Sequence, residues 1–382
     1  KMLSVARRSG RSVFTQTKRF ISLDTLPLRG GRSSVTGVVA TVFGSTGFVA
    51  RYVVNKLGRV GTQCVVPHRI YSEDRARHLK VMGDLGMIVP IPFHARDPES
   101  IAECVKESDI VINLMGKQEK TFNFDFFGSN VEAVSTLARI SKECGVPRFL
   151  HLSSVAADEK SESTWLRCKA LGEKAVLEHY PKATILRSNV IYGEEDKFLN
   201  NMAKWARIYG YVPIIGNGKN VVHPIYVDDV AEVIRACTYD DSYDGSIVEL
   251  NGPDAWTLPD IANWVRETCW IAETSKLRTF PDWTEHLPES LKGMSPHLLA
   301  GGISDSYLGL WPSDVFGPMS MLGIRGDFRA MNCNSWVPNK RLPQIDSFDI
   351  SPTPFTEIAS EYLRNYRPGG HFSVLHKKED VL

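Results

Sequence analysis

The chain has 382 residues, of which 43% are hydrophobic and 23% charged, and its formal net charge is +1. This length fits one large domain, or one large domain with a smaller one. The balanced charge argues against a nucleic-acid-binding surface, and no stretch reaches the roughly 18 consecutive apolar residues of a membrane-spanning helix. Seven scattered cysteines without a C-x-x-C pair favour a reducing compartment, with the cysteines as small core residues.

The first 34 residues form a basic segment. Residues 1–23 contain no acid and carry the basic residues Arg7, Arg8, Arg11, Lys18 and Arg19. This composition is typical of a mitochondrial presequence, although a chloroplast signal or a disordered basic tail would have a similar one. We therefore expect residues 1–34 to be a presequence or an extension.

Short apolar runs alternate with helical stretches from residue 37 onward. The run over 37–43 is rich in β-branched side chains and ends at Gly44, which predicts a buried strand followed by a helix over 48–59. Further strands are expected at 63–67, 87–91, 109–114, 148–152, 183–186 and 246–250, and helices at 130–144, 166–180 and 228–238. This alternation predicts an α/β fold with a doubly wound parallel sheet.

The segment between the first strand and the first helix resembles a dinucleotide fingerprint. It reads Gly44-Ser45-Thr46-Gly47-Phe48-Val49-Ala50. Gly44 would allow the tight turn, Gly47 the approach of the backbone to a pyrophosphate, and Ala50 the packing of helix on strand. The helix N-terminus would attract the negative charge. The alternative is that the glycines serve only the geometry of the turn.

The end of the second strand indicates which dinucleotide would bind. NAD-binding proteins usually carry Asp or Glu there for the ribose hydroxyls, whereas this chain reads Pro67-His68-Arg69. A guanidinium suits a 2′-phosphate, and Arg51 just after the fingerprint would supply a second clamp. The indicated cofactor is therefore NADPH, unless both arginines are solvated surface residues.

Three further positions follow the third and fourth strands. Asp97 would accept a bond from the adenine amine or cap the helix that begins near Pro98. Gly116 would let the cofactor pass close to the backbone, and Asn113 is a cofactor contact or a structural residue with equal weight.

With these residues the chain resembles the extended, atypical short-chain dehydrogenase/reductase superfamily over residues 37 to about 250. That family places a serine after the fifth strand and a Tyr-x-x-x-Lys on the next helix. Ser153 and Ser154 match the serine position and Lys169 matches the lysine, but the tyrosine position is occupied by Trp165. The resemblance implies that Ser153 and Lys169 contact the cofactor.

Trp165 removes the proton donor that the family's reaction requires. Hydride transfer to a carbonyl develops an alkoxide, and the tyrosine protonates it because an ammonium lowers the phenol pKa from about 10. An indole N–H donates a hydrogen bond but gives up no proton at physiological pH. Tyr192 and Tyr180 are the neighbouring phenols, and their positions favour structural roles. We therefore predict a site without a catalytic residue.

The domain boundaries follow from these motifs. We expect a Rossmann NADP(H)-binding domain over 35–250, with an insertion around 193–223 that contributes to a smaller, loop-rich domain over 251–382. Pro, Gly and Trp are frequent between 281 and 345, and the aromatic residues there form either an interface with neighbouring subunits or an ordinary small core. They include Trp283, Trp311, Phe316 and Trp336.

A narrower resemblance extends over the length of the chain. It rests on residues 40–48, 53–58, 77–86, 110–116, 193–200, 223–231 and 366–370. These segments are similar to the nucleotide-binding accessory subunits of mitochondrial respiratory complex I, the NADH:ubiquinone oxidoreductase. The resemblance implies a non-catalytic subunit with bound NADPH, located at the matrix side of the inner membrane. Other complex I subunits would be its partners, in the peripheral arm near the membrane junction.

The alternative from the enzyme class is a soluble NADPH-dependent reductase or sugar-nucleotide-modifying enzyme that uses another acid.

Overall fold

The structure is a computed structural model, and it describes residues 35–69, 73–117, 124–215, 218–280 and 336–369. A seven-stranded sheet forms the centre of the larger lobe, in the order β11-β6-β5-β4-β1-β2-β3. Every neighbouring pair is parallel. The strands are β1 (Val39–Phe43), β2 (Gln63–Arg69), β3 (Ile88–Phe93), β4 (Ile110–Asn113), β5 (Arg148–Ser154), β6 (Thr184–Ser188) and β11 (Ile247–Leu250). The predicted doubly wound parallel sheet is confirmed.

The strand order reverses between β1 and β4. From β1 the chain proceeds outward to β2 and β3, then returns to β4 and continues in the opposite direction. Ligands of such sheets bind outside the carboxyl ends of the strands at this reversal. The glycine-rich turn after β1 therefore lies where a nucleotide would be expected.

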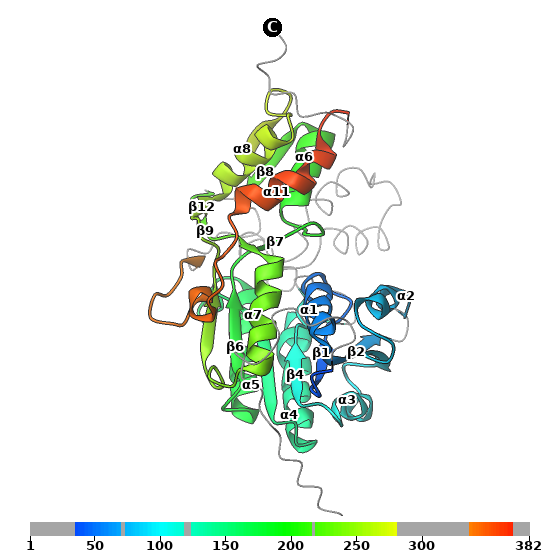
Figure 1. Cartoon of the computed structure of the whole chain (residues 1–382). Coiled ribbons are helices and arrows are strands. Elements are labelled where there is room, and N and C mark those ends of the chain that lie inside the picture. Colours follow the sequence, from blue (N-terminus) through cyan, green and yellow to red (C-terminus); the bar gives the residue numbers. More distant parts are fainter. Residues whose placement is uncertain (1–34, 70–72, 118–123, 216–217, 281–335, 370–382) are drawn as a thin grey trace, which may run out of the picture.

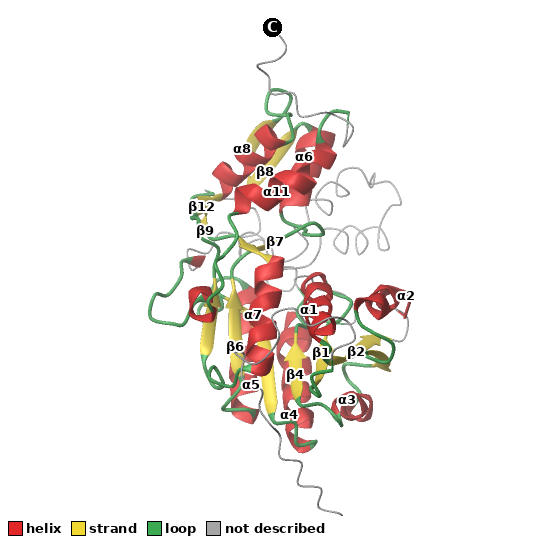
Figure 2. Cartoon of the chain, in the orientation of Figure 1, coloured by secondary structure: helices red, strands yellow, loops and turns green. Residues whose placement is uncertain are grey.

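Helices cover both faces of the sheet (Figures 1 and 2). Helices α1 (Phe48–Val60) and α7 (Val227–Tyr239) pack with one face in a hydrophobic cluster that includes Val53, Leu57 and Ile234. The other face contacts α3 (Pro98–Val105), α4 (Ala133–Glu143) and α5 (Thr164–His179). Because both faces are covered, the strands are apolar runs instead of alternating ones.

Shorter turns complete the larger lobe. They are α2 (Glu73–Arg77), η3 (His78–Met82) and η4 (Gly128–Glu132), the last a π-type turn that leads into α4. Five of the six described cysteines are buried, and the sixth, Cys144, is exposed. None of these six forms a disulfide.

A smaller lobe lies above the carboxyl ends of the strands in Figure 1. It contains α6 (Leu199–Tyr209), β8 (Tyr211–Ile215), α8 (Leu258–Thr268), β13 (Lys276–Phe280), α11 (Phe355–Leu363) and η9 (Arg364–Tyr366). β8 pairs with β13 in parallel. A third hydrophobic cluster fills this lobe and reaches the first turn of α5 at Trp165 and Leu166.

Two small strand pairs link the lobes. β7 (Ile191–Tyr192) pairs with β10 (Ile225–Tyr226), and β9 (Val221–Val222) pairs with β12 (Trp256–Thr257). Trp336 is 4% exposed and belongs to the third hydrophobic cluster, so it is a core residue. Trp283, Trp311 and Phe316 lie outside the described residues, as do residues 1–34.

The segment after Trp336 returns to the edge of the large sheet. The backbone N–H of Glu249 on β11 donates to the Pro343 carbonyl at 2.9 Å, and Gln344 forms a bridge with the same residue. The following turn, η8 (Ile345–Phe348), contacts α7. Within the described residues, no helix has the length and apolarity needed to cross a bilayer.

Candidate functional site

The turn between β1 and α1 has the geometry of a phosphate-binding turn. Gly44 has φ +80°, and a Cβ there would lie 2.9 Å from the carbonyl of Leu114 at the end of β4. Gly47 is the N-cap of α1, and among the described residues no side chain caps this helix and no acid occupies its first turn. The N–H groups at this helix N-terminus therefore remain available to an anion.

The side chains of Ser45, Thr46 and Phe48 in this turn have different surroundings. The buried Ser45 hydroxyl donates to the Pro67 carbonyl at 2.7 Å, which joins the turn to β2. Phe48 packs edge-on against Tyr52, while Thr46 is half-buried. Ser45 thus acts on the protein itself, a role that the sequence did not indicate.

The two candidate arginines lie on different elements, Arg51 in α1 and Arg69 at the end of β2. Arg69 is exposed at the end of β2, opposite Phe93 of β3. Arg51 turns to the loop after β7, where its Nη1 donates to Glu195 Oε1 at 2.7 Å. Arg69 therefore lies exposed at the strand end named in the sequence prediction, and Arg51 pairs with a carboxylate of the loop after β7.

Asp97 and Asn113 make structural hydrogen bonds. The Asp97 carboxylate accepts from the Glu99 N–H at 3.2 Å and caps α3, which is the capping role considered from the sequence. Asn113 Oδ1 accepts from the Met115 N–H at 3.0 Å, and its Nδ2 lies 3.1 Å from His151 Nδ1.

Lys169 lies on α5, at the lysine position of the Tyr-x-x-x-Lys spacing considered in the sequence. Its side chain is buried, and its Nζ donates to the Leu152 carbonyl at 3.4 Å. A Cβ on the exposed Gly116 would lie 2.8 Å from this Nζ, so the lysine reaches the backbone beside which a cofactor would pass. Burial lowers the pKa of Lys169 to about 8, while nearby Glu173 opposes the shift.

Several buried polar atoms on β5 and η4 lack hydrogen-bond partners among the described residues. They are Ser153 Oγ, Ser154 Oγ, Asn130 Oδ1 and His151 Nε2. Buried polar groups are normally paired, so each of these four atoms has the capacity for a further polar partner. The described residues contain no group of three or more His, Cys, Asp or Glu side chains that could hold a metal.

Asn130 was not indicated by the sequence. It lies in the π-type turn η4, and its Nδ2 donates to the Phe126 carbonyl at 3.0 Å. Its Oδ1 would lie 3.7 Å from a Cβ on Gly116. The expected helix start at residue 130 gave no sign of this turn. π-type turns are frequent at functional sites.

Trp165 fills the tyrosine position with a buried indole. It is 8% exposed and packs in the cluster of the smaller lobe. The two neighbouring phenols are bound elsewhere, because Tyr192 Oη donates to the Thr353 carbonyl and Tyr180 Oη to the Val146 carbonyl. Burial raises the pKa of Tyr180 to about 12 and that of Tyr192 further. Both phenol protons are therefore engaged in hydrogen bonds to backbone carbonyls.

The strand order, the glycine turn and the Ser/Lys pair define a protein of the NAD dependent epimerase/dehydratase family, whose model matches residues 40–245. Within that class, the chain belongs to the family of the mitochondrial NADH dehydrogenase (ubiquinone) 1 alpha subcomplex subunit 9 proteins. The Arabidopsis thaliana protein of that name is 46% identical over 343 residues, which cover 89% of this chain and 81% of the relative.

Two further comparisons agree with this family. The 40 kDa subunit of NADH-ubiquinone oxidoreductase from Neurospora crassa is 39% identical, over 91% of this chain and 84% of its own. A dTDP-glucose 4,6-dehydratase from Streptomyces venezuelae, solved with NAD bound, has a TM-score of 0.56 at 18% identity. That match covers 74% of this chain and 96% of the dehydratase, and it shows the fold.

Proposed function

We propose that this chain is a non-catalytic accessory subunit of mitochondrial complex I that holds NADPH as part of its folded structure. The observation that carries the proposal is the contrast along α5. Lys169 is retained beside Gly116, whereas a buried Trp165 stands where a proton donor is required. A positioned acid contributes about 10²–10⁴-fold to such reactions, so a site without one is suited to binding and poorly suited to turnover.

The residues present fit a nicotinamide dinucleotide. The uncapped N-terminus of α1 suits the pyrophosphate, and Lys169 with the unpaired hydroxyls of Ser153 and Ser154 suits the ribose and nicotinamide. Arg69 supports NADPH over NADH because a guanidinium forms charge-assisted bonds with a 2′-phosphate. Asp97 and Asn113 already make structural hydrogen bonds. They would contact the nucleotide only through side-chain hydrogen-bonding capacity that these bonds do not use.

The bound nucleotide would stabilise the subunit and the assembly that depends on it. A ligand that binds only the folded state adds RT ln(1 + [L]/Kd), about 4 kcal/mol at a thousandfold excess over Kd. The names of the plant and fungal relatives support membership of complex I in mitochondria. We place the subunit on the matrix side, in the peripheral arm near the membrane junction.

The native protein provides the direct test. Purified from mitochondria, it should migrate with complex I and release close to one NADPH per chain on denaturation. A nucleotide-free chain, or one that migrates entirely as a free monomer, would contradict the proposal. Transfer of label from 4-deuterated NADPH to a product, abolished in Lys169→Ala, would favour a reductase instead.

The position of the 2′-phosphate is tested by Arg69→Asp. This change should weaken NADPH binding by at least tenfold more than NADH binding, because it replaces an attractive charge by a repulsive one. Arg139→Asp, an equal charge change on an exposed face of α4, is the matched control. Equal losses for both nucleotides would show that Arg69 does not contact the phosphate.

A further inference from the structure

The loop after β7 contacts the first helix of the larger lobe through one carboxylate. Glu195 Oε1 accepts from Arg51 Nη1 at 2.7 Å, and Oε2 accepts from Tyr52 Oη at 2.7 Å. Both donors lie in the first turns of α1, close to the N-terminus that faces the candidate pyrophosphate position. Each carboxylate oxygen of Glu195 therefore has its own donor on α1. These two bonds hold the loop after β7 in a fixed position relative to α1.

The same loop packs directly against the start of α1. A Cβ on Gly193 would lie 3.0 Å from Phe48 Cζ and 2.7 Å from Val227 Cγ1. Only a glycine allows the backbone to come this close to Phe48, which is the first residue of α1. A shift of the α1 N-terminus would therefore displace the loop as well.

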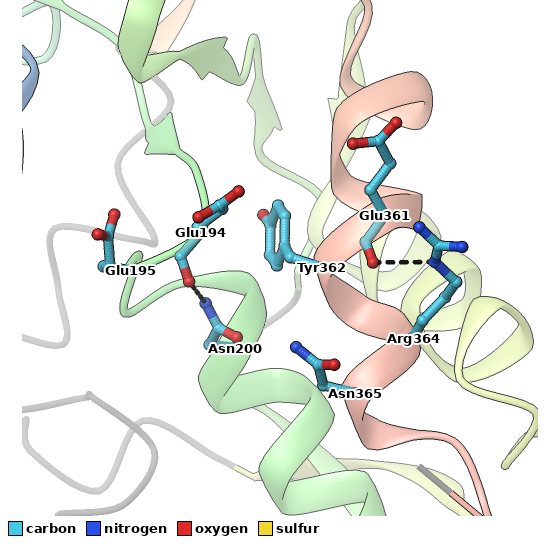
Figure 3. Close-up of a pocket in the computed structure, with 7 residues that line it drawn as sticks. All are labelled: Glu194, Glu195, Asn200, Glu361, Tyr362, Arg364 and Asn365. Carbon is cyan, nitrogen blue, oxygen red and sulfur yellow. Dashed lines mark hydrogen bonds between the residues drawn. The ribbon is translucent and has the colours of Figure 1, made fainter. Parts of the chain in front are cut away.

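Asp196, which follows Glu195 in the loop, forms hydrogen bonds with the smaller lobe. Asp196 is 5% exposed, and its Oδ1 accepts from the Asn200 N–H at 3.0 Å while its Oδ2 accepts from Tyr362 Oη at 3.1 Å. Tyr366 Oη donates to Asn200 Oδ1 at 2.9 Å. Figure 3 shows Tyr362 on α11 facing the loop and α6 across the pocket that they line together.

These bonds form one continuous path from the nucleotide turn to α11. It runs from Phe48 and Arg51 through Glu195 and Asp196 to Tyr362. Arg51 and Glu195 are 144 residues apart in sequence, and Tyr362 lies 166 residues beyond Asp196. The path thus connects three segments that no local contact would join.

We propose that Glu195 is a positioning residue that transmits occupancy of the nucleotide site to α11 of the smaller lobe. This inference rests on the proposed binding of NADPH. A nucleotide that fixes the N-terminus of α1 fixes Arg51 and Tyr52, and through Glu195 and Asp196 it restricts the local opening of α11. Coupling between two sites is reciprocal, so ordering of α11 would strengthen nucleotide binding by the same factor.

The tyrosine hydroxyls in these contacts stay protonated, so their hydrogen bonds do not depend on pH near neutrality. Burial and the neighbouring Glu195 raise the pKa of Tyr52 well above its ordinary value, so its hydroxyl keeps the proton that it donates. Burial likewise raises the pKa of Tyr362. The hydroxyls of Tyr52 and Tyr362 therefore remain hydrogen-bond donors across the physiological pH range.

The test measures amide hydrogen exchange of α11 in the full chain with and without saturating NADPH. In the wild-type chain NADPH should slow exchange of α11 by about fivefold, the lower end of usual coupling factors. Glu195→Gln and Tyr362→Phe interrupt the path at different steps, and each should lose most of that gain. Tyr362→Phe should also weaken NADPH binding by about the same factor, although it touches no candidate nucleotide contact.

Asp228→Asn is the matched control. It removes the Lys56–Asp228 ion pair, which joins α1 to α7 inside the larger lobe, and should leave the effect of NADPH on α11 intact. An equal slowing of α11 exchange in Glu195→Gln and the wild-type chain would overturn the inference. Wild-type binding of NADPH without any change in α11 would overturn it and leave the proposed function standing, whereas absence of binding would refute both.

Discussion

The close approach of Gly44 to β4 predicts a large loss of stability for Gly44→Ala. An alanine at φ +80° pays about 1–2 kcal/mol for the left-handed conformation. Its Cβ would also lie 2.9 Å from the carbonyl carbon and oxygen of Leu114. These are backbone atoms of the residue that directly follows β4, whose N–H is bonded to the Phe43 carbonyl of β1, so they cannot rotate away as a side chain could. Overpacking of this kind costs about 1–3 kcal/mol. We expect the free energy of unfolding to fall by about 2–5 kcal/mol.

The steric part of this loss is isolated by Gly145→Ala. Gly145 has φ +77°, and a Cβ there would meet nothing within 4 Å, so only the conformational cost of about 1–2 kcal/mol applies. Urea-induced unfolding of both variants, followed by circular dichroism, gives the two free energies on one scale. Equal losses would refute the argument that the backbone of Leu114 confines Gly44.

Three other substitutions test neighbouring contacts. Gly116→Ala should change stability by less than about 1 kcal/mol, because the one contact of its Cβ shorter than 3.4 Å would be with Lys169 Nζ, the end of a flexible side chain. It should nevertheless weaken NADPH binding in a fluorescence titration, and unchanged affinity would place the nucleotide elsewhere. Ser45→Ala should cost about 1 kcal/mol in thermal or urea unfolding, since it removes the bond to Pro67, and a neutral result would mean that this bond contributes nothing. The lowered pKa of Lys169, about 8 in the folded chain against 10.5, means that the unfolded chain binds more protons between these pH values. The free energy of unfolding therefore increases as the pH rises from about 8 to 10.5, because the cost of burying a charged Lys169 is progressively removed. Lys169→Met should remove this contribution, and parallel pH profiles of the two chains would contradict it.

The sheet could be predicted from the sequence because its strands are buried on both faces and appear as uninterrupted apolar runs. The ends of the elements depended on neighbours. β2 extends to Arg69 because its last residues pair with β3, although a run ending in Pro67 gave no such signal. The helical turns before α4 begin already at Phe126, and the Gly128 N–H in these turns donates to Asp125 Oδ1 at 2.6 Å.

The candidate site could be predicted only where its residues are local in sequence. The glycine turn and Lys169 follow from spacing on single elements. The partner of Arg51 is Glu195, and no spacing rule joins residues so far apart. The sequence places Ser45 in the dinucleotide fingerprint, and only the folded chain brings the Pro67 carbonyl within reach of its hydroxyl.

The return of residues 343–344 to β11 has a consequence for how this chain meets other proteins. This segment forms backbone contacts with β11, one outer strand of the sheet. The opposite outer strand, β3, contains Pro90 and Pro92, which lack a backbone N–H donor. Open sheet edges are the usual sites where a foreign strand adds to a sheet. With one edge covered by its own chain and the other depleted of donors, this sheet cannot readily be extended by a neighbour. Contacts within a larger assembly would then be made by side chains on helices and loops, where charge and shape distinguish the correct partner.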